Sequence, residues 1–344
     1  MASVILRNSA VLSDYGRPYI VAEINTSHFG NLDTAKQMIT RAKEIGVDCV
    51  KFQSWSAETL YSKSYYDENP IAKRFVEKLA FSDSDLFELA EYCKKCGISF
   101  ASTPYSRDEV DFLVQKCDVP YIKVASMELN NLPYLEYIGL SGVPVVLSTG
   151  MGDFAEIGKA VATIERTGNR SICILHCVSN YPAEMSAIRL RNIVGLREAF
   201  PDYAIGYSDH SVGTELASAA VALGACMIEK HFTLDQKKIG MDNQMATEPG
   251  EMAILVRNCR NVHLALGDTE RIVSSDELAQ RKKMRRSIVA ATNLKVGATL
   301  KAGDLDAKRP GTGLSPEKIH DLIGRTVLRD IEADTLIRAS DISE

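Results

Sequence analysis

Short apolar runs recur along the first two-thirds of the chain, and each run is continuous rather than alternating with polar residues. Continuous runs of this length are typical of parallel strands whose two faces are both covered by other elements. The runs cover residues 19–24, 47–53, 98–103, 121–126, 143–149, 171–178, 204–209 and 226–232. The pattern therefore predicts eight buried strands.

Helical patterns lie between these runs. Residues 32–45 carry apolar side chains at helical spacing, and residues 84–96 do the same before Gly97, which stands in a helix-stop position. Residues 216–224 are rich in alanine and apolar all round, which predicts a buried helix. The alternation of strands and helices over about 270 residues fits an α/β fold of the (β/α)8 TIM barrel type. A doubly wound open sheet gives a similar alternation.

Polar side chains at the strand ends favour the barrel over the open sheet. A barrel gathers the C-terminal ends of all its strands around one mouth, whereas an open sheet spreads them along an edge. Nearly every run ends in such groups, namely Glu23, Lys51 with Gln53, Thr103, Lys123 with Ser126 and Glu128, Ser148 with Thr149, His176, Ser208 with Asp209 and His210, and Glu229 with His231.

The character of the chain changes after residue 270. Residues 271–285 are charged and show no strand pattern, so we expect a linker with some helix. From residue 286 the runs are short and are separated by glycines, which indicates a small β-rich domain. The predicted organisation is a barrel catalytic domain at 1–270, a linker at 271–285 and a tail domain at 286–344.

Composition narrows the class of protein. The 344 residues are 45% hydrophobic and 25% charged with a net charge of −5, so no basic surface for nucleic acid or an anionic membrane is expected. No apolar stretch is long enough to span a bilayer, and the N-terminus lacks the pattern of a signal peptide. The eight scattered cysteines have no framework spacing. We expect a cytoplasmic protein.

Two histidines suggest a metal site. His210 and His231 each follow an apolar run, and their separation equals about one strand–helix–strand step. Neighbouring barrel strands would bring both imidazoles to one divalent ion and leave positions for water and a substrate oxygen. A pair of hydrogen-bonded core histidines is the alternative. Asp209 and Glu229 stand beside the two histidines as possible hydrogen-bond partners of the imidazoles. His28 and His176 are possible additions to the site.

Lysines and carboxylates at the strand ends supply further candidate chemistry. Lys51 and Lys123 facing one mouth suit a phosphate or a carboxylate, although each could instead be paired with a glutamate. Glu23 and Glu128 are the candidates for acid–base catalysis. The strand-end hydroxyls could hold phosphate oxygens or simply form turns, and they are Thr103, Ser126, Ser148 and Ser208.

Several ordered motifs resemble the sialic acid synthase family, and the likeness covers essentially the whole chain. The tail resembles the antifreeze-like (SAF) domain that members of this family carry after the barrel. The matching segments are 22–24, 51–53, 123–128, 148–151, 176–177, 181–182, 206–210, 229–235, 248–251 and 308–313.

The resemblance implies a reaction. Phosphoenolpyruvate would condense with an N-acyl mannosamine-type sugar to give a nine-carbon 2-keto-3-deoxy acid and phosphate. His210 and His231 would hold Mn²⁺ or Mg²⁺. The resemblance also implies a homodimer with exchanged tails, in which Arg309 of one subunit contacts the N-acyl group bound by the other. Lys51, Lys123, Ser126 and Ser208 would bind phosphoenolpyruvate, and Gln53, Tyr181 and Asp242 would face the sugar.

Three positions depart from the family pattern on the sugar side. Met241 and Asn243 replace a proline and a histidine around Asp242, and Ser179 stands where some members have asparagine before Tyr181. A diacetamido hexose, as in legionaminate- or pseudaminate-type synthases, is therefore an alternative acceptor. A different metal-dependent condensation of phosphoenolpyruvate, an aldolase, and a non-catalytic sugar- or ice-binding module are more distant alternatives.

Overall fold

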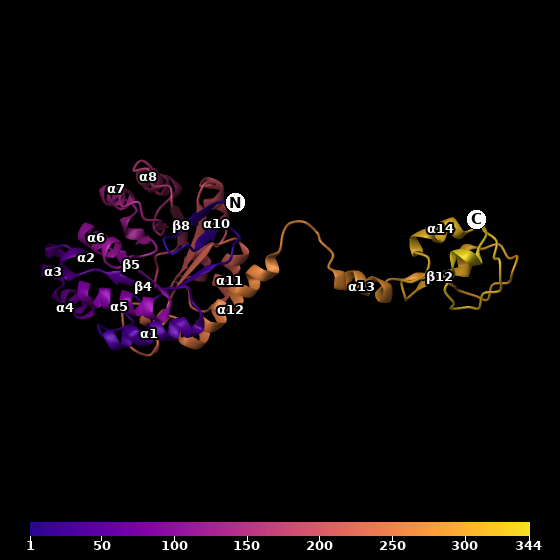
Figure 1. Cartoon of the computed structure of the whole chain (residues 1–344), viewed down its shortest axis with the longest axis horizontal. Coiled ribbons are helices and arrows are strands. Elements are labelled where there is room, and N and C mark those ends of the chain that lie inside the picture. The colour runs from indigo at the N-terminus through magenta and orange to yellow at the C-terminus, as the bar shows by residue number, and fades with distance from the viewer. The chain divides into compact units, whose positions relative to one another are not determined.

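The structure, a computed structural model, describes residues 1–344, and the chain divides into two units at Met1–Gly267 and Asp268–Glu344 (Figure 1). Eight parallel strands form the centre of the first unit, in the order β5-β4-β3-β10-β9-β8-β7-β6. The end strands β5 and β6 lie against each other, so the sheet curves round into a barrel. The strands are β3 (Tyr19–Glu23), β4 (Cys49–Ser54), β5 (Ser99–Pro104), β6 (Ile122–Val124), β7 (Val145–Ser148), β8 (Ile172–Cys177), β9 (Ala204–Asp209) and β10 (Met227–His231). The predicted barrel and all eight predicted strands are confirmed.

Helices surround the barrel, and local sequence signals fix their ends. The side chain of Asn31 accepts a hydrogen bond from the Thr34 amide at the start of α1, and Gly46 ends that helix in the left-handed conformation. At α5, the Ser82 side chain accepts a hydrogen bond from the Asp85 amide at the start, and Gly97 ends the helix in the left-handed conformation. The predicted helix stop at Gly97 is therefore confirmed. The helices are α1 (Leu32–Ile45), α2 (Ala57–Leu60), α3 (Lys63–Glu68), α4 (Pro70–Leu79), α5 (Asp83–Cys96), α6 (Arg107–Gln115), α7 (Leu132–Leu140), α8 (Phe154–Glu165), α9 (Met185–Ile188), α10 (Asn192–Ala199), α11 (Glu215–Ala222) and α12 (Pro249–Leu266).

A short N-terminal hairpin, β1 (Ser3–Ile5) with β2 (Val11–Ser13), was not predicted because its strands are too short to show a period. Its apolar side chains Val4, Leu6 and Leu12 pack in one buried cluster with residues from the barrel strands, among them Tyr19 and Met227. Tyr19 and Met227 begin their strands, so the hairpin covers the N-terminal end of the barrel. The C-terminal end is left as the place for a site.

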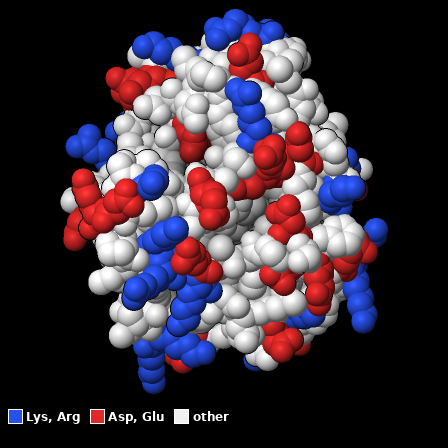
Figure 2. Space-filling model, turned by 90° about the vertical axis from the view of Figure 1, so that its left-hand side faces the viewer, with Lys and Arg blue, Asp and Glu red and all other residues white.

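Helices α2, α3 and α4 form an insertion between β4 and α5 that the sequence pattern did not reveal. A separate apolar cluster holds it together, with Trp55 directly after β4 and Tyr66, Val76 and Leu79 from the insertion itself. The insertion therefore extends the C-terminal side of the barrel. Figure 2 shows acidic and basic side chains interspersed over one face of the molecule, as the small net charge suggests.

The second unit contains α13 (Ser275–Met284), which lies in the predicted linker, followed by the tail domain. Strands β11 (Ser287–Ala290) and β12 (Leu305–Lys308) pair antiparallel, and isolated β-bridges extend the pairing. Short turns connect them, with α14 (Ile319–Leu322) among them. The tail has an apolar core of its own, which includes Ile288, Leu300, Val327 and Ile337. No helix of either unit has the length and apolarity required to cross a membrane.

Candidate active site

A cavity of about 370 Å³ lies at the C-terminal end of the barrel. Its floor receives a side chain from every strand, because alternate residues of each strand point into the barrel. These side chains are Glu23 from β3, Lys51 from β4, Thr103 from β5, Lys123 from β6, Ser148 from β7, Cys177 from β8, Ser208 from β9, and Glu229 with His231 from β10.

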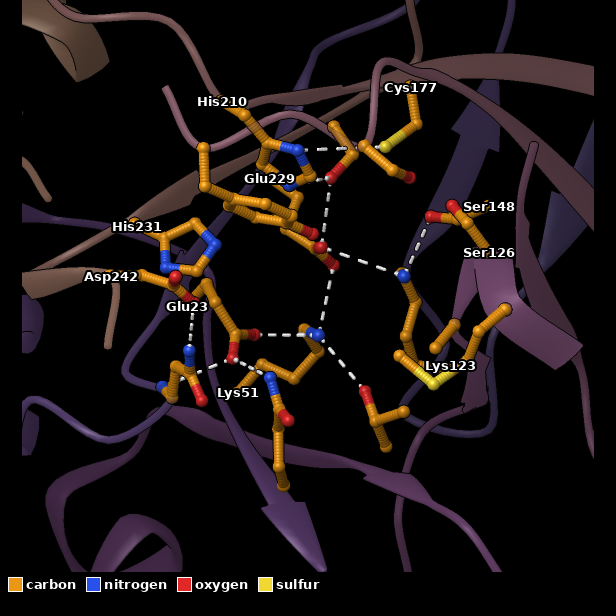
Figure 3. Close-up of a pocket in the computed structure, with 18 of the residues that line it drawn as sticks. Glu23, Lys51, Lys123, Ser126, Ser148, Cys177, His210, Glu229, His231 and Asp242 are labelled. Atoms are coloured by element: carbon orange, nitrogen blue, oxygen red, sulfur yellow. Dashed lines mark hydrogen bonds and ion pairs between the residues drawn. The ribbon is translucent and has the colours of Figure 1, made fainter. Parts of the chain in front are cut away.

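Two lysines and two glutamates form the charged floor of this cavity (Figure 3). Lys51 Nζ lies 2.6 Å from Glu23 Oε2 and 3.5 Å from Glu229 Oε2, and it donates to Thr103 Oγ1 at 3.0 Å. Lys123 Nζ lies 3.6 Å from Glu229 Oε1. Each of the four side chains is at most 5% exposed. Glu229 therefore links the two lysines.

Burial and pairing set the protonation of these groups in opposite directions. Burial raises the pKa of Glu23, and the charge of Lys51 offsets this effect only in part. Burial also acts to raise the pKa of Glu229, but Lys123 and Lys51 together outweigh it and hold that pKa below its ordinary value. Burial lowers the pKa of Lys123 despite the nearby Glu229. Glu23 is thus the carboxylate better able to accept a proton, and Lys123 is the lysine better able to release one.

The two histidines meet beside this floor. Their ring centroids are 5.4 Å apart, and the Tyr181 ring lies 4.2 Å from that of His210. His210 Nδ1 donates to the Val178 carbonyl at 2.8 Å, which leaves Nε2 facing Ser208 Oγ at 3.4 Å. Burial lowers the pKa of His231 well below its ordinary value, so its ring is neutral at pH 7, the form that binds metals. Nowhere do three or more His, Cys, Asp or Glu side chains form a metal-binding group, so a metal here would rely on two imidazoles, water and substrate.

Three serines form a second polar group in the cavity. Ser126 Oγ accepts a hydrogen bond from the Gly150 amide at 3.0 Å, and Ser148 Oγ accepts one from Lys123 Nζ at 2.7 Å. The Ser179 hydroxyl is buried and has no partner. A Cβ at Gly150 would lie 2.1 Å from Ser179 Oγ and 2.9 Å from Ser126 Oγ. Only glycine therefore permits this arrangement, and the unpaired Ser179 hydroxyl is suited to an anionic oxygen.

The residues expected to face a sugar also line the cavity. Gln53 donates to Glu23 Oε1 at 3.2 Å, and the Asp242 carboxylate accepts a short hydrogen bond from Asn25. Burial raises the pKa of Asp242. Tyr181 is about half exposed, at 49%.

Of the departures from the family pattern, Met241 and Ser179 line the cavity but Asn243 does not. Asn243 is buried, accepts from Thr233 Oγ1 at 2.6 Å, and donates to the Asp235 and Lys238 carbonyls at 2.8 and 2.7 Å. Asn243 thus holds together the loop that carries Met241 and Asp242.

Some expected residues lie elsewhere. Glu128 accepts a hydrogen bond from Asn131 at 2.8 Å and does not line the cavity. His28 Nδ1 accepts from the Gly30 amide, and His176 Nε2 donates to the Ile188 carbonyl, so both rings have other partners. Arg309 is an exposed residue of the second unit.

Two further expectations about acidic residues change with the structure. Asp209 was expected beside His210, but strand alternation turns it to the outer face of the barrel, where it pairs with Lys230. Glu229 was expected only as a partner of the histidines, yet it stands at the centre of the charged floor. The sequence could have predicted that Glu229 points into the barrel, because residues 229 and 231 of one strand must share a face.

Comparison with known proteins gave consistent results. The model of the NeuB family matches residues 38–271, and the model of the SAF domain matches residues 285–343. The N,N'-diacetyllegionaminic acid synthase of Legionella pneumophila is 35% identical over 332 residues, which is 93% of each chain. The human N-acetylneuraminate-9-phosphate synthase is 38% identical over 93% of this chain and 91% of its own. A crystal structure of an N-acetylneuraminic acid synthetase from Leptospira borgpetersenii serovar Hardjo-bovis superposes with a TM-score of 0.74 at 31% identity, covering 81% of this chain and 94% of that one.

Proposed function

The chain belongs to the NeuB family and is a nonulosonic (sialic-type) acid synthase, and on this premise we propose how its cavity performs the reaction. The substrates are phosphoenolpyruvate and an N-acyl mannosamine-type sugar, and the products are a nine-carbon 2-keto-3-deoxy acid and phosphate. The observation that carries this proposal is the convergence of Lys51 and Lys123 with Glu23 and Glu229 beside the two histidines.

Phosphoenolpyruvate binds to the floor. Lys123 and Lys51 offer ammonium groups to its phosphate and carboxylate, and Ser126 and Ser208 offer hydroxyl groups. Ser179, which was expected on the sugar side, joins them, because its hydroxyl lies with that of Ser126 beside Gly150. These hydrogen bonds to an anion are charge-assisted. Of the three lysine–glutamate contacts in the cavity, the one between Lys123 and Glu229 is the longest, at 3.6 Å, so the Lys123 ammonium group is the less tightly paired of the two.

His210 and His231 hold a divalent ion, Mn²⁺ or Mg²⁺. The arrangement fits such an ion, because both rings border the cavity and His210 keeps Nε2 free of backbone partners. When bound, the ion supplies Lewis-acid polarisation of the carbonyl oxygen of the open-chain sugar. Gln53, Tyr181 and Asp242 orient the sugar, and this positioning of two substrates is a large part of the acceleration.

The covalent steps follow from this placement. The methylene carbon of phosphoenolpyruvate forms a bond to the aldehyde carbon with the electron pair of its double bond, and the aldehyde oxygen takes up a proton from solvent to become a hydroxyl group. Water adds to the carbon that bears phosphate, and Glu23 accepts its proton and later returns it to solvent. The C–O bond to phosphate then breaks, and phosphate leaves with the proton of the added hydroxyl group as the keto group forms. Glu23 fits the role of base better than Glu128, because only Glu23 lines the cavity and its pKa is raised.

The test is phosphate release from phosphoenolpyruvate, measured with and without an N-acyl mannosamine and Mn²⁺. Release is expected only with all three components, and chelation with EDTA should stop it reversibly. The Lys123→Met variant should lose activity, whereas Lys94→Met, which changes a lysine with an 80% exposed side chain, should not. Release with no sugar present, or turnover with pyruvate in place of phosphoenolpyruvate, would overturn the proposal and favour an aldolase or a different condensation.

A diacetamido hexose is a second candidate acceptor, and the rim of the cavity favours it. The loops above the floor contribute apolar side chains that are at least 40% exposed, namely Tyr61, Met127, Met151 and Met241. A second acetamido group and a deoxy position offer apolar surface to such a rim, whereas hydroxyl groups do not. A comparison of kcat/KM for 2-acetamido and 2,4-diacetamido hexoses, with mass spectrometry of the products, distinguishes the two classes.

The tail domain completes the site in the same proposal. Arg309 from the tail of one subunit contacts the N-acyl group held in the barrel of its partner, in a homodimer with exchanged tails. An exposed arginine supports this role, because its guanidinium is open to solvent and free to meet another subunit. The oligomeric state is measured by sedimentation equilibrium, and a monomer with full activity would contradict it.

A further inference from the structure

A buried ion pair lies outside the barrel wall, directly behind the two histidines. Lys230 and Asp209 are both 0% exposed, and Lys230 Nζ lies 2.8 Å from Asp209 Oδ2. The two residues are register partners on the neighbouring strands β10 and β9. Because side chains alternate along a strand, these two point away from the cavity, while Ser208 and Glu229 beside them point into it.

The pair reaches the histidines through the backbone. Lys230 precedes His231 and Asp209 precedes His210 in the sequence. Lys230 Nζ also donates to the carbonyl of Ser211, the residue after His210, at 2.5 Å. The ammonium group of Lys230, the residue before His231, thus contacts Asp209 and Ser211, the two residues that flank His210.

Asp209 fixes the same turn from its other oxygen. Its Oδ1 accepts hydrogen bonds from the Ser211 amide at 2.9 Å, the Ser211 hydroxyl at 2.6 Å and the Tyr207 hydroxyl at 3.1 Å. The backbone before and after His210 is therefore held to the same carboxylate. Within the cavity, by contrast, the His210 ring has one backbone partner, Val178.

The energetic cost of burying two charges indicates that this ion pair does more than stabilise the fold. Removing two charges from water costs several kcal/mol per ion, and well-packed apolar residues often replace a buried pair without loss of stability. The better attested use of such pairs is to fix a particular geometry. The geometry fixed here is the separation of strands β9 and β10 at the level of the two imidazoles.

We propose that Lys230 and Asp209 are positioning residues, a clamp outside the barrel that sets the separation of His210 and His231 and hence the affinity for the divalent ion. The inference rests on the proposed function insofar as it concerns the metal. The separation of the two rings belongs to the protein alone and can be measured without metal.

The test uses the double variant Lys230→Met/Asp209→Asn in the full-length protein. This variant removes both charges, leaves no unpaired buried ion, and keeps an amide oxygen for Ser211 and Tyr207. Its matched control is Arg197→Met/Asp14→Asn, which removes another ion pair, 3.2 Å long, between α10 and the residue that follows β2. Thermal unfolding is measured first, to establish whether each variant is folded.

The clamp variant is expected to bind Mn²⁺ about 10- to 100-fold more weakly than the parent, by electron paramagnetic resonance of free Mn²⁺, with the control within twofold. Its metal-free crystal structure is expected to show the ring centroids displaced from 5.4 Å. An unchanged Kd together with unchanged ring separation would overturn the clamp. If the parent protein binds no Mn²⁺, the proposed metal site fails, and the ring separation in the variant still decides the clamp.

Discussion

Glu23 and Lys51 are register partners on neighbouring strands, and their Oε2 and Nζ atoms are 2.6 Å apart. Parallel pairing of β3 with β4 therefore places an acid and a base side by side at the barrel mouth. The ion pair keeps Glu23 within reach of a proton carrier, while burial keeps the pKa of its carboxyl group above the ordinary value.

The first prediction concerns this carboxylate. Glu23→Gln should lower kcat by about 10²- to 10⁴-fold, because the amide cannot accept a proton from water. Glu128→Gln should change kcat by less than about threefold, since Glu128 contacts Asn131 outside the cavity. Steady-state phosphate release measures both. The reverse order of effects would assign the base to Glu128.

Substitution of Gly150 should weaken the binding of phosphoenolpyruvate. A Cβ there would press on the hydroxyls of Ser126 and Ser179, so Gly150→Ala should raise the KM for phosphoenolpyruvate about tenfold and destabilise the fold by about 1–3 kcal/mol. Gly158→Ala in α8 is the matched control, because its Cβ meets nothing within 4 Å. The control should be neutral or slightly stabilising in chemical denaturation. Normal phosphoenolpyruvate binding by the Gly150 variant would remove Ser126 and Ser179 from the proposed binding site.

His28 should make stability depend on pH. Its ring stacks on Phe81, and burial lowers its pKa from 6.5 to about 4. The unfolded chain therefore takes up a proton before the folded protein does, and stability should fall as the pH drops from about 6.5 to about 4. The loss attributable to this group is about 3 kcal/mol.

The variant His28→Asn tests this, because an amide oxygen can still accept from the Gly30 amide but does not titrate in this range. Urea denaturation at several pH values should show a shallower decline for the variant. Identical slopes for the two proteins would show that His28 does not contribute.

Asn243 should act on the acceptor through its loop. Asn243→Ala removes three hydrogen bonds that hold the segment carrying Met241 and Asp242, each worth about 1 kcal/mol. The KM for the sugar should rise severalfold while that for phosphoenolpyruvate stays the same. Asn8→Ala, which removes hydrogen bonds to Tyr19 and Ser99 at the other end of the barrel, should leave both constants unchanged. An equal rise in both KM values would mean that the loop supports the whole cavity.

Substitution of Arg309 should weaken the binding of the sugar rather than that of phosphoenolpyruvate. Arg309→Ala should raise the apparent KM of the acceptor more than that of phosphoenolpyruvate, since the guanidinium is proposed to contact the N-acyl group. Lys318→Ala, another exposed cation of the tail, serves as the control. Mixing Arg309→Ala with Glu23→Gln subunits should restore part of the activity if tails are exchanged, because one mixed site then has both residues. Equal effects on the two substrates would contradict the proposed contact.

The hydrophobic pattern determined the barrel, its eight strands and the residues at their C-terminal ends. This was possible because strands buried on both faces are continuous apolar runs, and barrel geometry brings all their ends to one mouth. Lys51, Lys123, Ser208 and His231 line the cavity for that reason. The family motifs added the expected reaction and the tail domain, and the family and domain models match the same regions.

Tertiary structure decided how the charges pair. Glu229 and Asp209 are both acidic residues at strand ends, yet one joins two lysines inside the cavity and the other joins Lys230 behind the wall. Which face a residue takes depends on strand register, and a shift of one residue reverses it. The short N-terminal hairpin likewise depends on contacts with barrel strands distant in sequence. The role of Asn243 depends on how the loop from Thr233 onward folds back on itself, which the hydrophobic pattern does not record.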